Sequence, residues 1–228
     1  YKMTLIVSVD GNIGSGKSTI LRTLKERFSA DPNIIFLQEP VDQWEEIKDK
    51  NGETILSKFY ENQEKYSFAF QMMAYISRLS LLKETIEKNP GAIIITERCL
   101  DTDRHVFAKM LYDSGKIEEV EYQIYLRWFD HFIDDKQTKK IIYLKTDPHV
   151  CFYRIAKRNR TGESNISLEY LEECHKYHED MIEQTHCDKL VIDGNVDREE
   201  NNSIVDVWIK EIKEFLSIDG DFHENSYG

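Results

Sequence analysis

The sequence predicts an α/β fold in which a five-stranded parallel sheet carries helices on both faces. Short apolar runs rich in β-branched residues alternate along the chain with longer stretches of helical periodicity. An apolar run with no polar alternation indicates a strand that is buried on both faces. Buried strands that alternate with helices are joined by right-handed crossovers, so the strands run parallel.

Five apolar runs predict the strands, at residues 4–9, 34–38, 92–96, 141–145 and 189–193. Helical patterns predict helices at residues 17–28, 60–88, 103–112, 117–134, 148–158 and 167–184. We expect one domain over residues 1–216, with a polar loop at about residues 158–165, and a disordered tail over residues 217–228. Ligands of an open parallel sheet bind beyond the carboxyl ends of its strands, so functional residues should follow each strand.

Composition narrows the classes of partner. The 228 residues carry a net charge of −12, with Lys and Arg spread along the chain. We therefore expect no nucleic-acid binding, which depends on clustered basic residues, although a small anionic ligand needs only a few local cations. The four cysteines have no paired spacing, which indicates reduced thiols in a cytoplasmic protein; a mitochondrial location or the cytosol of a virus-infected host stays open. We expect no membrane span, and an ordinary helix face instead of a zinc site at Cys174, His175 and His178.

The segment after the first predicted strand reads GNIGSGKS and matches the P-loop pattern G-x-x-x-x-G-K-[ST], which binds a nucleoside triphosphate. Glycines let backbone N–H groups wrap a phosphate, and the start of the next helix adds positive potential. The lysine reaches the outer phosphates, and the final serine is a typical Mg²⁺ ligand. The predicted nucleotide-binding residues here are Gly11, Asn12, Ile13, Gly14, Ser15, Gly16, Lys17, Ser18 and Thr19.

Charged residues also follow the second and third predicted strands. Glu39 comes just before Pro40, and a carboxylate there suits the base that takes the proton of a hydroxyl acceptor; a solvated loop acid is the alternative. Glu97 and Arg98 join an anion suited to Mg²⁺ or water with a cation suited to developing phosphate charge, the alternative being a surface ion pair. Together with the P-loop, these strand ends predict one site for phosphoryl transfer.

A polar segment between two predicted helices carries Arg158, Arg160 and Glu163, and Arg154 lies one helical turn earlier. A loop of this kind closes over bound phosphates and brings arginine charge to a loose phosphoryl transition state. A solvated basic turn is the alternative. The sequence thus adds an arginine lid to the predicted site.

These motifs together resemble the deoxynucleoside kinase family, which includes the deoxycytidine, deoxyguanosine and insect multisubstrate enzymes. The matching segments agree in order and spacing over nearly the whole chain, and they read GNIGSGKST, EPVDQW, YENQEKYSFAFQ, ERCLDTDRHVF, RIAKRNRTGE and LEYLEECHKYHE. The resemblance implies a P-loop kinase fold with a short arginine lid. It also implies Mg²⁺-dependent transfer of the ATP γ-phosphoryl group to the 5′-hydroxyl of a deoxynucleoside in nucleotide salvage.

The resemblance assigns roles to the matching residues around the reacting groups. Glu39 resembles the base that activates the 5′-hydroxyl, and Arg98 the partner that orients it and stabilises the transferred phosphate. Glu97 resembles the acid near Mg²⁺, where Ser18 is the other expected ligand. With Lys17, the catalytic set is completed by the lid residues Arg158 and Arg160, while Arg154 resembles the arginine that packs on the donor base.

The acceptor side is assigned in the same way. Gln71 resembles the residue that reads the nucleobase edge, because its amide both donates and accepts. Phe107 resembles the aromatic residue that stacks on the base, with packing in the core as the alternative. Trp44 should line the same pocket. Tyr60 and Glu163 resemble the pair that grips the sugar 3′-hydroxyl.

The preferred base is expected to depend on Ala74, Arg78 and Asp103. Arg78 and Asp103 match the deoxycytidine and deoxypurine enzymes, and an Arg–Asp pair fills the space that a thymine methyl needs. Deoxycytidine or a purine deoxynucleoside is therefore expected over thymidine; an ion pair that only ties two helices is the alternative. Cys99 and Tyr66 depart from the usual family residues, and because Cys99 is expected near the base pocket, the exact base stays open. The loop after the last strand matches the family loosely, so the donor among triphosphates stays open.

Three other functions remain at this stage: a thymidine or multisubstrate kinase, a nucleoside monophosphate kinase, and a nucleotide-gated binding module that passes phosphate to water. The pair Tyr60 and Glu163 argues against a phosphorylated acceptor. Glu97-Arg98 takes the place of the strand-end Asp of ordinary P-loop ATPases, which argues against the module. The resemblance further implies a homodimer built on the helices predicted at 60–88 and 117–134.

Overall fold

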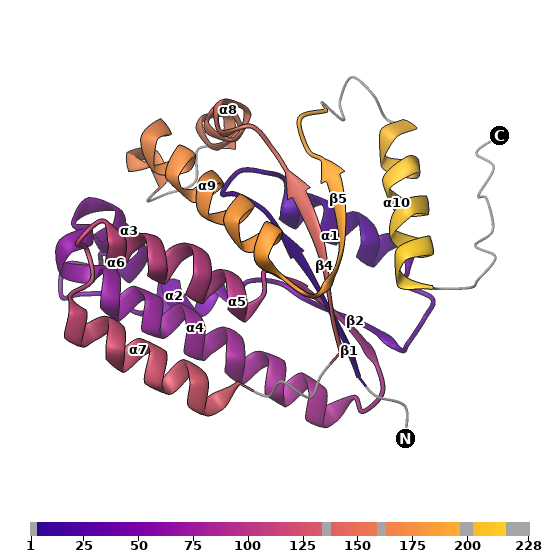
Figure 1. Ribbon diagram of the computed structural model, residues 1–228, viewed down its shortest axis with the longest axis horizontal. Coiled ribbons are helices and arrows are strands. Elements are labelled where there is room, and N and C mark those ends of the chain that lie inside the picture. The colour runs from indigo at the N-terminus through magenta and orange to yellow at the C-terminus, as the bar shows by residue number, and fades with distance from the viewer. Residues whose placement is uncertain (1–3, 134–137, 159–162, 197–202, 218–228) are drawn as a thin grey trace. The chain divides into compact units, whose positions relative to one another are not determined.

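The computed structural model describes residues 4–133, 138–158, 163–196 and 203–217, and it confirms the α/β class (Figure 1). All strands of the sheet pair in parallel, in the order β2-β3-β1-β4-β5. Their bounds are β1 Leu5–Asp10, β2 Ile34–Leu37, β3 Ile93–Glu97, β4 Thr138–Lys145 and β5 Asp188–Asp193. Because β1 is the central strand, the loop that follows it lies at the middle of the carboxyl edge, where the strand order reverses.

Helices flank the sheet on both sides, with α1 on one side and the adjacent pair α4 and α7 on the other (Figure 1). The helices of this part are α1 Lys17–Arg27, α2 Val41–Glu46, α3 Ile55–Glu61, α4 Gln63–Lys88, α5 Leu100–Thr102, η1 Asp103–Ala108, α6 Lys109–Asp113, α7 Glu119–Phe132, α8 Pro148–Arg158, η2 Glu163–Asn165 and α9 Leu168–Gln184. Of these, η1 is a π-helical segment and η2 a 3₁₀ turn.

Several predicted boundaries were wrong. The single helix expected at 60–88 is two helices, because the Asn62 side chain accepts from the Lys65 N–H and starts α4 anew. The helix expected at 103–112 begins earlier, at Leu100, and passes through the π-helical segment. Strand β4 begins at Thr138 instead of Ile141, and the short helix α2 was not predicted.

Aromatic side chains fill the core beside the carboxyl edge. Phe59 stacks on Phe70 with ring centroids 4.7 Å apart, and Trp44 meets Phe70 edge-on at 5.5 Å. A second cluster joins α4 to α7, where Tyr75 lies 5.0 Å from the Phe129 ring. These clusters fix α4 in position along the sheet, which matters because α4 carries several of the predicted site residues.

The chain divides into two compact units, Tyr1–Asn195 and Val196–Gly228. The described part of the second contains helix α10, Ser203–Leu216, which the sequence analysis did not predict. Its large apolar residues Trp208, Ile209, Ile212 and Leu216 recur at helical spacing. The tail predicted at 217–228 lies outside the described residues except for Ser217. Among the described helices, none combines the length and apolarity that a membrane crossing requires.

Candidate active site

The P-loop between β1 and α1 has the backbone that its glycines allow. Gly14 and Gly16 adopt φ values of 78° and 105°, which residues with a side chain rarely adopt. A Cβ at Gly14 would lie 2.6 Å from the Cys151 carbonyl oxygen of α8, so the loop is packed against that helix. The Asn12 side chain donates to the Leu171 carbonyl at 2.8 Å and ties the loop to α9. The backbone is thus held open for a phosphate.

Lys17 and Ser18, at the start of α1, lie beside the end of β3. The Lys17 ammonium is buried and donates to the Asn12 carbonyl at 2.7 Å. Burial and the nearby Arg98 charge lower the pKa of Lys17 to about 8, although Glu97 and Glu39 oppose this. The Ser18 hydroxyl donates to the Glu97 carboxylate at 2.6 Å, which brings the two predicted Mg²⁺ ligands together.

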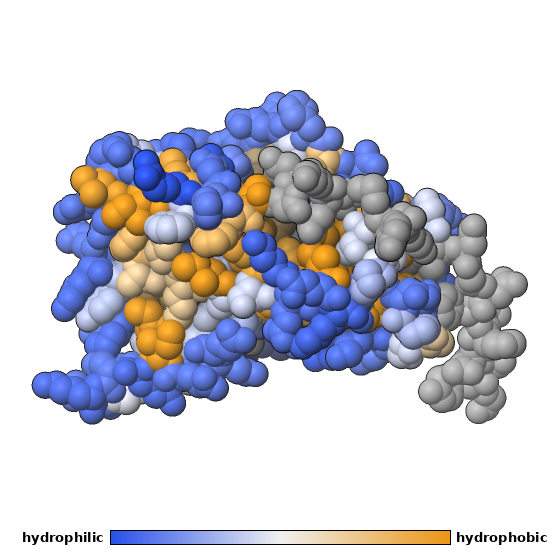
Figure 2. All heavy atoms as spheres, turned by 90° about the horizontal axis from the view of Figure 1, so that it is seen from below, coloured by the Kyte–Doolittle hydropathy of each residue, from blue (hydrophilic) through white to orange (hydrophobic). Residues whose placement is uncertain are grey.

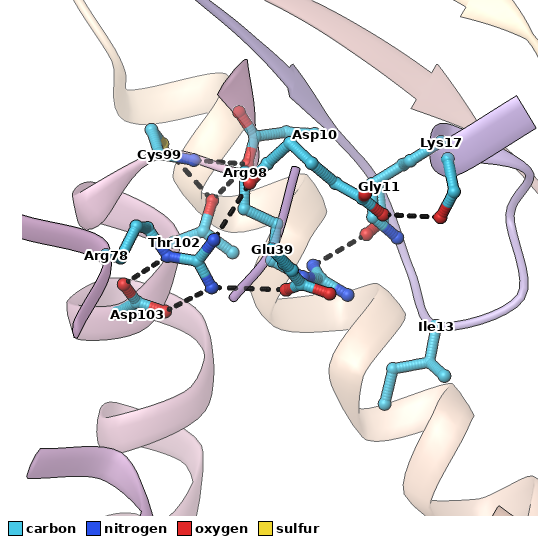
Figure 3. A network of polar contacts seen from close by, with 12 residues as sticks. Asp10, Gly11, Ile13, Lys17, Glu39, Arg78, Arg98, Cys99, Thr102 and Asp103 are labelled. Atoms are coloured by element: carbon cyan, nitrogen blue, oxygen red, sulfur yellow. Dashed lines mark hydrogen bonds and ion pairs between the residues drawn. The ribbon is translucent and has the colours of Figure 1, made fainter. Parts of the chain in front are cut away.

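Glu39, which follows β2, is the centre of an ionic network (Figure 3). Its Oε1 atom accepts from Arg98 Nε at 2.9 Å and from Arg78 Nη2 at 3.1 Å. Burial by itself raises the pKa of Glu39, but Arg98, Arg78 and Lys17 outweigh it and hold the pKa at about 2. The Glu39 carboxylate therefore stays ionised through the neutral range.

Arg78 on α4 binds more groups than the sequence analysis expected. Its Nε donates to Asp103 Oδ2 at 2.9 Å, and its Nη1 donates to the Glu97 carbonyl at 2.8 Å. The predicted Arg78–Asp103 pair is therefore present, and the same guanidinium also reaches Glu39. Arg78 links the loops after β2 and β3 to the helix that carries the base-side residues.

Arg98 has an unusual backbone, with φ at 65°, in the left-handed region that disfavours side chains. Arg98 is 4% exposed, and its guanidinium donates from Nη1 to the Gly11 carbonyl at 2.9 Å, besides its bond to Glu39. The same group lies 4.8 Å above the Phe107 ring. Arg98 thus connects the P-loop, the Glu39 carboxylate and the predicted base-stacking residue.

His178 on α9 was read from the sequence as part of an ordinary helix face, but it is fully buried against Arg98. Its Nδ1 lies 2.7 Å from the Cys174 carbonyl, which only accepts, so Nδ1 carries the proton. The bare Nε2 then accepts from Arg98 Nη1 at 3.4 Å. Burial, Arg98 and Lys17 lower the pKa of His178, so the ring is neutral. His178 lies one helical turn after the buried Cys174 in the segment LEECHKYH, and this spacing was the signal that could have identified His178 as buried.

The predicted base-side residues come from α2, α4 and η1. Gln71 is 2% exposed on α4, one turn before Ala74, and Trp44 donates its indole N–H to Ser77 Oγ at 2.9 Å. Phe107 lies in the π-helical segment, one turn after Asp103; such segments are frequent at functional sites. Phe107 also meets the His178 ring edge-on at 6.0 Å. Of these side chains, Phe107 is linked to the Glu39 network through Arg98, whose guanidinium lies 4.8 Å from the Phe107 ring.

On the sugar side, Glu163 at the start of η2 accepts two bonds from Arg158, at 2.7 Å and 2.6 Å. Tyr60 on α3 is close enough for its pKa to be raised by burial and by the Glu163 carboxylate. Its ring meets Tyr170 of α9 edge-on at 6.3 Å, and the Tyr170 hydroxyl is a buried group that the sequence analysis missed. Arg160 and the rest of the predicted lid at 159–162 lie outside the described residues.

Arg154 on α8 connects the P-loop with the loop after β5. Its Nη1 donates to the Ser15 carbonyl at 3.1 Å and to the Gly194 carbonyl at 2.9 Å. The loop is tightly packed, because a Cβ at Gly194 would lie 2.1 Å from the Thr146 hydroxyl oxygen. Arg154 therefore lies between the two loops where the resemblance expects the donor nucleotide.

The site defines a P-loop phosphotransferase. Its P-loop lies at the centre of a parallel sheet and contains a buried lysine, and beside it lie a paired serine and carboxylate and an acid that two arginines hold. Comparison with known proteins is more specific. The sequence model of the family described as deoxynucleoside kinase matches residues 7–217. The chain belongs to the deoxynucleoside kinase family and is a nucleoside kinase, and the family implies ATP as phosphate donor.

Curated relatives agree with this assignment. Deoxycytidine kinase of Homo sapiens is 34% identical over 239 residues, which covers 92% of this chain and 90% of the human one. Deoxycytidine kinase 1 of Xenopus laevis is 32% identical over 238 residues, with the same shares covered. Deoxycytidine kinase 2 of Gallus gallus is 33% identical over 241 residues, again covering 92% and 90%.

Proposed function

We propose that the chain transfers the γ-phosphoryl group of ATP to the 5′-hydroxyl of a deoxynucleoside, with deoxycytidine or a purine deoxynucleoside preferred over thymidine, as a step of nucleotide salvage. The observation that carries this proposal is the Glu39 carboxylate, held by Arg98 and Arg78 beside the P-loop. A carboxylate can take the proton of an attacking hydroxyl group as the hydroxyl attacks phosphorus. It suits the capture of a hydroxyl acceptor.

The donor half of the reaction belongs to the P-loop. Backbone N–H groups of residues 11–18 bind the phosphates, Lys17 contacts the outer ones, and Arg154 holds the Ser15 and Gly194 carbonyls around the nucleotide. Ser18 and Glu97 fit Mg²⁺, because their oxygens lie 2.6 Å apart and Mg²⁺ is usually held by one or two protein oxygens plus phosphates and waters. When bound, Mg²⁺ neutralises charge that develops on the phosphates.

At the acceptor, Glu39 accepts a hydrogen bond from the 5′-hydroxyl and takes its proton as the phosphoryl group moves. With a pKa of about 2, Glu39 is a weak base. This is adequate for phosphoryl transfer, because the loose transition state needs positioning more than early proton removal. Arg98, fixed by Glu39, Gly11 and His178, stabilises the transferring group.

The rest of the acceptor is recognised by groups that flank this network. Tyr60 and Glu163 bind the 3′-hydroxyl, and Arg158 orients the Glu163 carboxylate. Gln71 reads the base edge and Phe107 stacks on the ring. Arg78 supplies hydrogen-bond donors for the base and Asp103 supplies a carboxylate, and this pair favours deoxycytidine or a purine deoxynucleoside as the acceptor. The names of the relatives, which are deoxycytidine kinases, support the same preference.

The test is Glu39→Gln, which removes the base while keeping the shape of the side chain. We expect kcat to fall by about 10²–10⁴-fold, while deoxycytidine and ATP binding, measured by calorimetry, change less than about threefold. Asp42→Asn, an exposed acid nearby on α2, is the matched control and should retain wild-type turnover. A Glu39→Gln enzyme with near wild-type kcat contradicts the assignment of Glu39 as base.

We also propose that the chain forms a homodimer through α4 and α7. Large apolar side chains recur every four residues on the outer face of α7, and Ile76 of α4 is 46% exposed beside them; the α7 residues are Val120, Ile124, Trp128 and Phe132. Figure 2 shows apolar side chains gathered on the underside of the molecule, where these helices lie. A face of this kind is typical of a helix-to-helix interface between subunits.

Sedimentation velocity tests the dimer. We expect the wild type to sediment at twice the 27.0 kDa chain mass and the variant Ile124→Glu with Trp128→Glu at the chain mass. Phe152→Glu, an apolar residue 42% exposed on α8, is the control and should remain dimeric. A wild type that stays monomeric at micromolar concentration overturns the proposal.

A further inference from the structure

Asp10 is a buried carboxylate that none of the assigned roles uses. It is the last residue of β1, is 0% exposed, and immediately precedes the P-loop. Its Oδ1 accepts from the Cys99 backbone N–H at 3.2 Å and from the Thr102 hydroxyl. Its Oδ2 is buried with no hydrogen-bond partner among the described residues. A half-satisfied buried carboxylate is costly, so its retention calls for a functional reason.

The two bonds of Asp10 end on the segment that directly follows Arg98. Figure 3 shows the Asp10 carboxylate turned toward Cys99 and Thr102, which are the residue before the short helix α5 and its last residue. Arg98 itself has the left-handed backbone described above, a conformation that relaxes unless its surroundings hold it. The strained backbone of Arg98 is therefore adjacent in sequence to Cys99, whose N–H binds Asp10.

The Arg98 turn is fixed on each side. The Arg98 N–H donates to the Val9 carbonyl at 3.0 Å, and the Thr96 hydroxyl donates to the Arg98 carbonyl at 2.8 Å. The Cys99 N–H is the next backbone group, and Asp10 is its acceptor. Without Asp10, the peptide group between Arg98 and Cys99 keeps the hydrogen bond to its carbonyl from Thr96 but loses the one from its N–H.

We propose that Asp10 is a positioning residue, which holds the strained Arg98 backbone through Cys99 and Thr102 and so keeps the Arg98 guanidinium on Glu39 and the Gly11 carbonyl. This inference rests on the catalytic role proposed for Arg98. Asp10 touches no group of the reaction itself. The central strand thus supplies the loop that binds the donor and, one residue earlier, the anchor of the arginine that acts on it.

A double-mutant cycle on kcat tests the proposal. Asp10→Ala removes both bonds, and we expect kcat to fall about ten- to a hundredfold, as misplacement by about 1 Å typically does, with the nucleoside KM changed less than about threefold. In an Arg98→Lys background, which already lacks the positioned guanidinium, Asp10→Ala should cost less than about threefold more. Losses that multiply in full would mean that Asp10 acts independently of Arg98, and would overturn the proposal.

Further variants separate position from folding. Asp10→Asn keeps an acceptor oxygen toward Cys99 and Thr102 and should retain kcat within about threefold; a loss as large as that of Asp10→Ala contradicts the hydrogen-bond account. If Asp10→Ala does not fold, Thr102→Val removes one of the two Asp10 bonds, together with the Thr102 hydroxyl contacts to the Cys99 and Met181 sulfur atoms, and the same cycle is run with it. Thr85→Val, which removes a buried hydroxyl bound to the Leu81 carbonyl of α4, is the control and should keep full turnover.

The outcomes distinguish this inference from the proposed function. If Arg98→Lys alone retains wild-type kcat, the catalytic role of Arg98 fails, and the Asp10 proposal fails with it. If Arg98→Lys loses turnover but Asp10→Ala does not, only the Asp10 proposal is overturned.

Discussion

Replacing Arg78 with methionine should strongly destabilise the protein, because three partners lose one buried guanidinium. The Arg78 side chain is 8% exposed, its partner Asp103 is 3% exposed, and Glu39 is 19% exposed. Removing one member of a buried ion pair typically costs about 3–5 kcal/mol, since the remaining charge is left unpaired. For a chain of this size, each kcal/mol shifts the melting temperature by about 2–4 °C. The expected decrease is therefore about 6–20 °C.

Urea unfolding, followed by tryptophan fluorescence, measures this free energy directly. Lys116→Met is the control, because Lys116 pairs with Glu64 at 3.3 Å on the surface, with 33% and 77% of the two side chains exposed. Exposed pairs contribute about 0–1 kcal/mol. The double variant Arg78→Met with Asp103→Asn should recover much of the loss, because no unpaired charge remains at position 103. If Arg78→Met costs no more than Lys116→Met, the buried network does not carry the energy inferred from its geometry.

Three further predictions follow from other parts of the site. Gly14→Ala should weaken ATP binding at least tenfold in a calorimetric titration, because its Cβ would meet the Cys151 carbonyl. Gly52→Ala is the control for backbone strain alone and should bind normally, because Gly52 has φ at 86° and a Cβ there would meet no atom of the described residues within 4 Å. Glu163→Gln should abolish the preference for deoxycytidine over its 3′-deoxy analogue in kcat/KM, and an unchanged preference would remove Glu163 from the sugar site. Burial by itself raises the pKa of Glu39, but its arginine neighbours outweigh burial and lower the pKa from 4.5 to about 2. The contribution of Glu39 to the free energy of unfolding is therefore present above pH 4.5 and lost as the pH falls toward 2. Glu39→Gln should flatten the pH dependence of the unfolding free energy over this range.

The fold was predictable because each buried strand is a short apolar run, and because alternating strands and helices allow few topologies. Local signals were missed where they were short. Asn62 is a common helix-starting residue, yet the helical pattern on both sides of it concealed the break between α3 and α4. Helix α10 carries a clear apolar spacing, which was the signal that could have identified it, whereas the six-residue α2 offers too few residues for periodicity to show.

The donor site was predictable for a different reason. The residues that bind phosphate lie next to one another in the sequence, so their spacing alone identifies them. Arg78 instead reaches Glu39 across 39 positions, and that contact depends on where the aromatic clusters place α4. His178 likewise contacts Arg98 from 80 positions away, and Asp10 binds Cys99, the residue after Arg98, from 89 positions away.

We expect the site to transfer phosphate to a deoxynucleoside that Arg78 and Asp103 select. The most direct test is a set of kcat/KM values for the four deoxynucleosides, with ATP and Mg²⁺, in one coupled assay that also includes deoxycytidine monophosphate. We expect deoxycytidine or a purine deoxynucleoside to give the highest value and the monophosphate to give no transfer. Thymidine as the best acceptor would contradict the role of Arg78 and Asp103, and efficient transfer to the monophosphate would contradict the acceptor site as a whole.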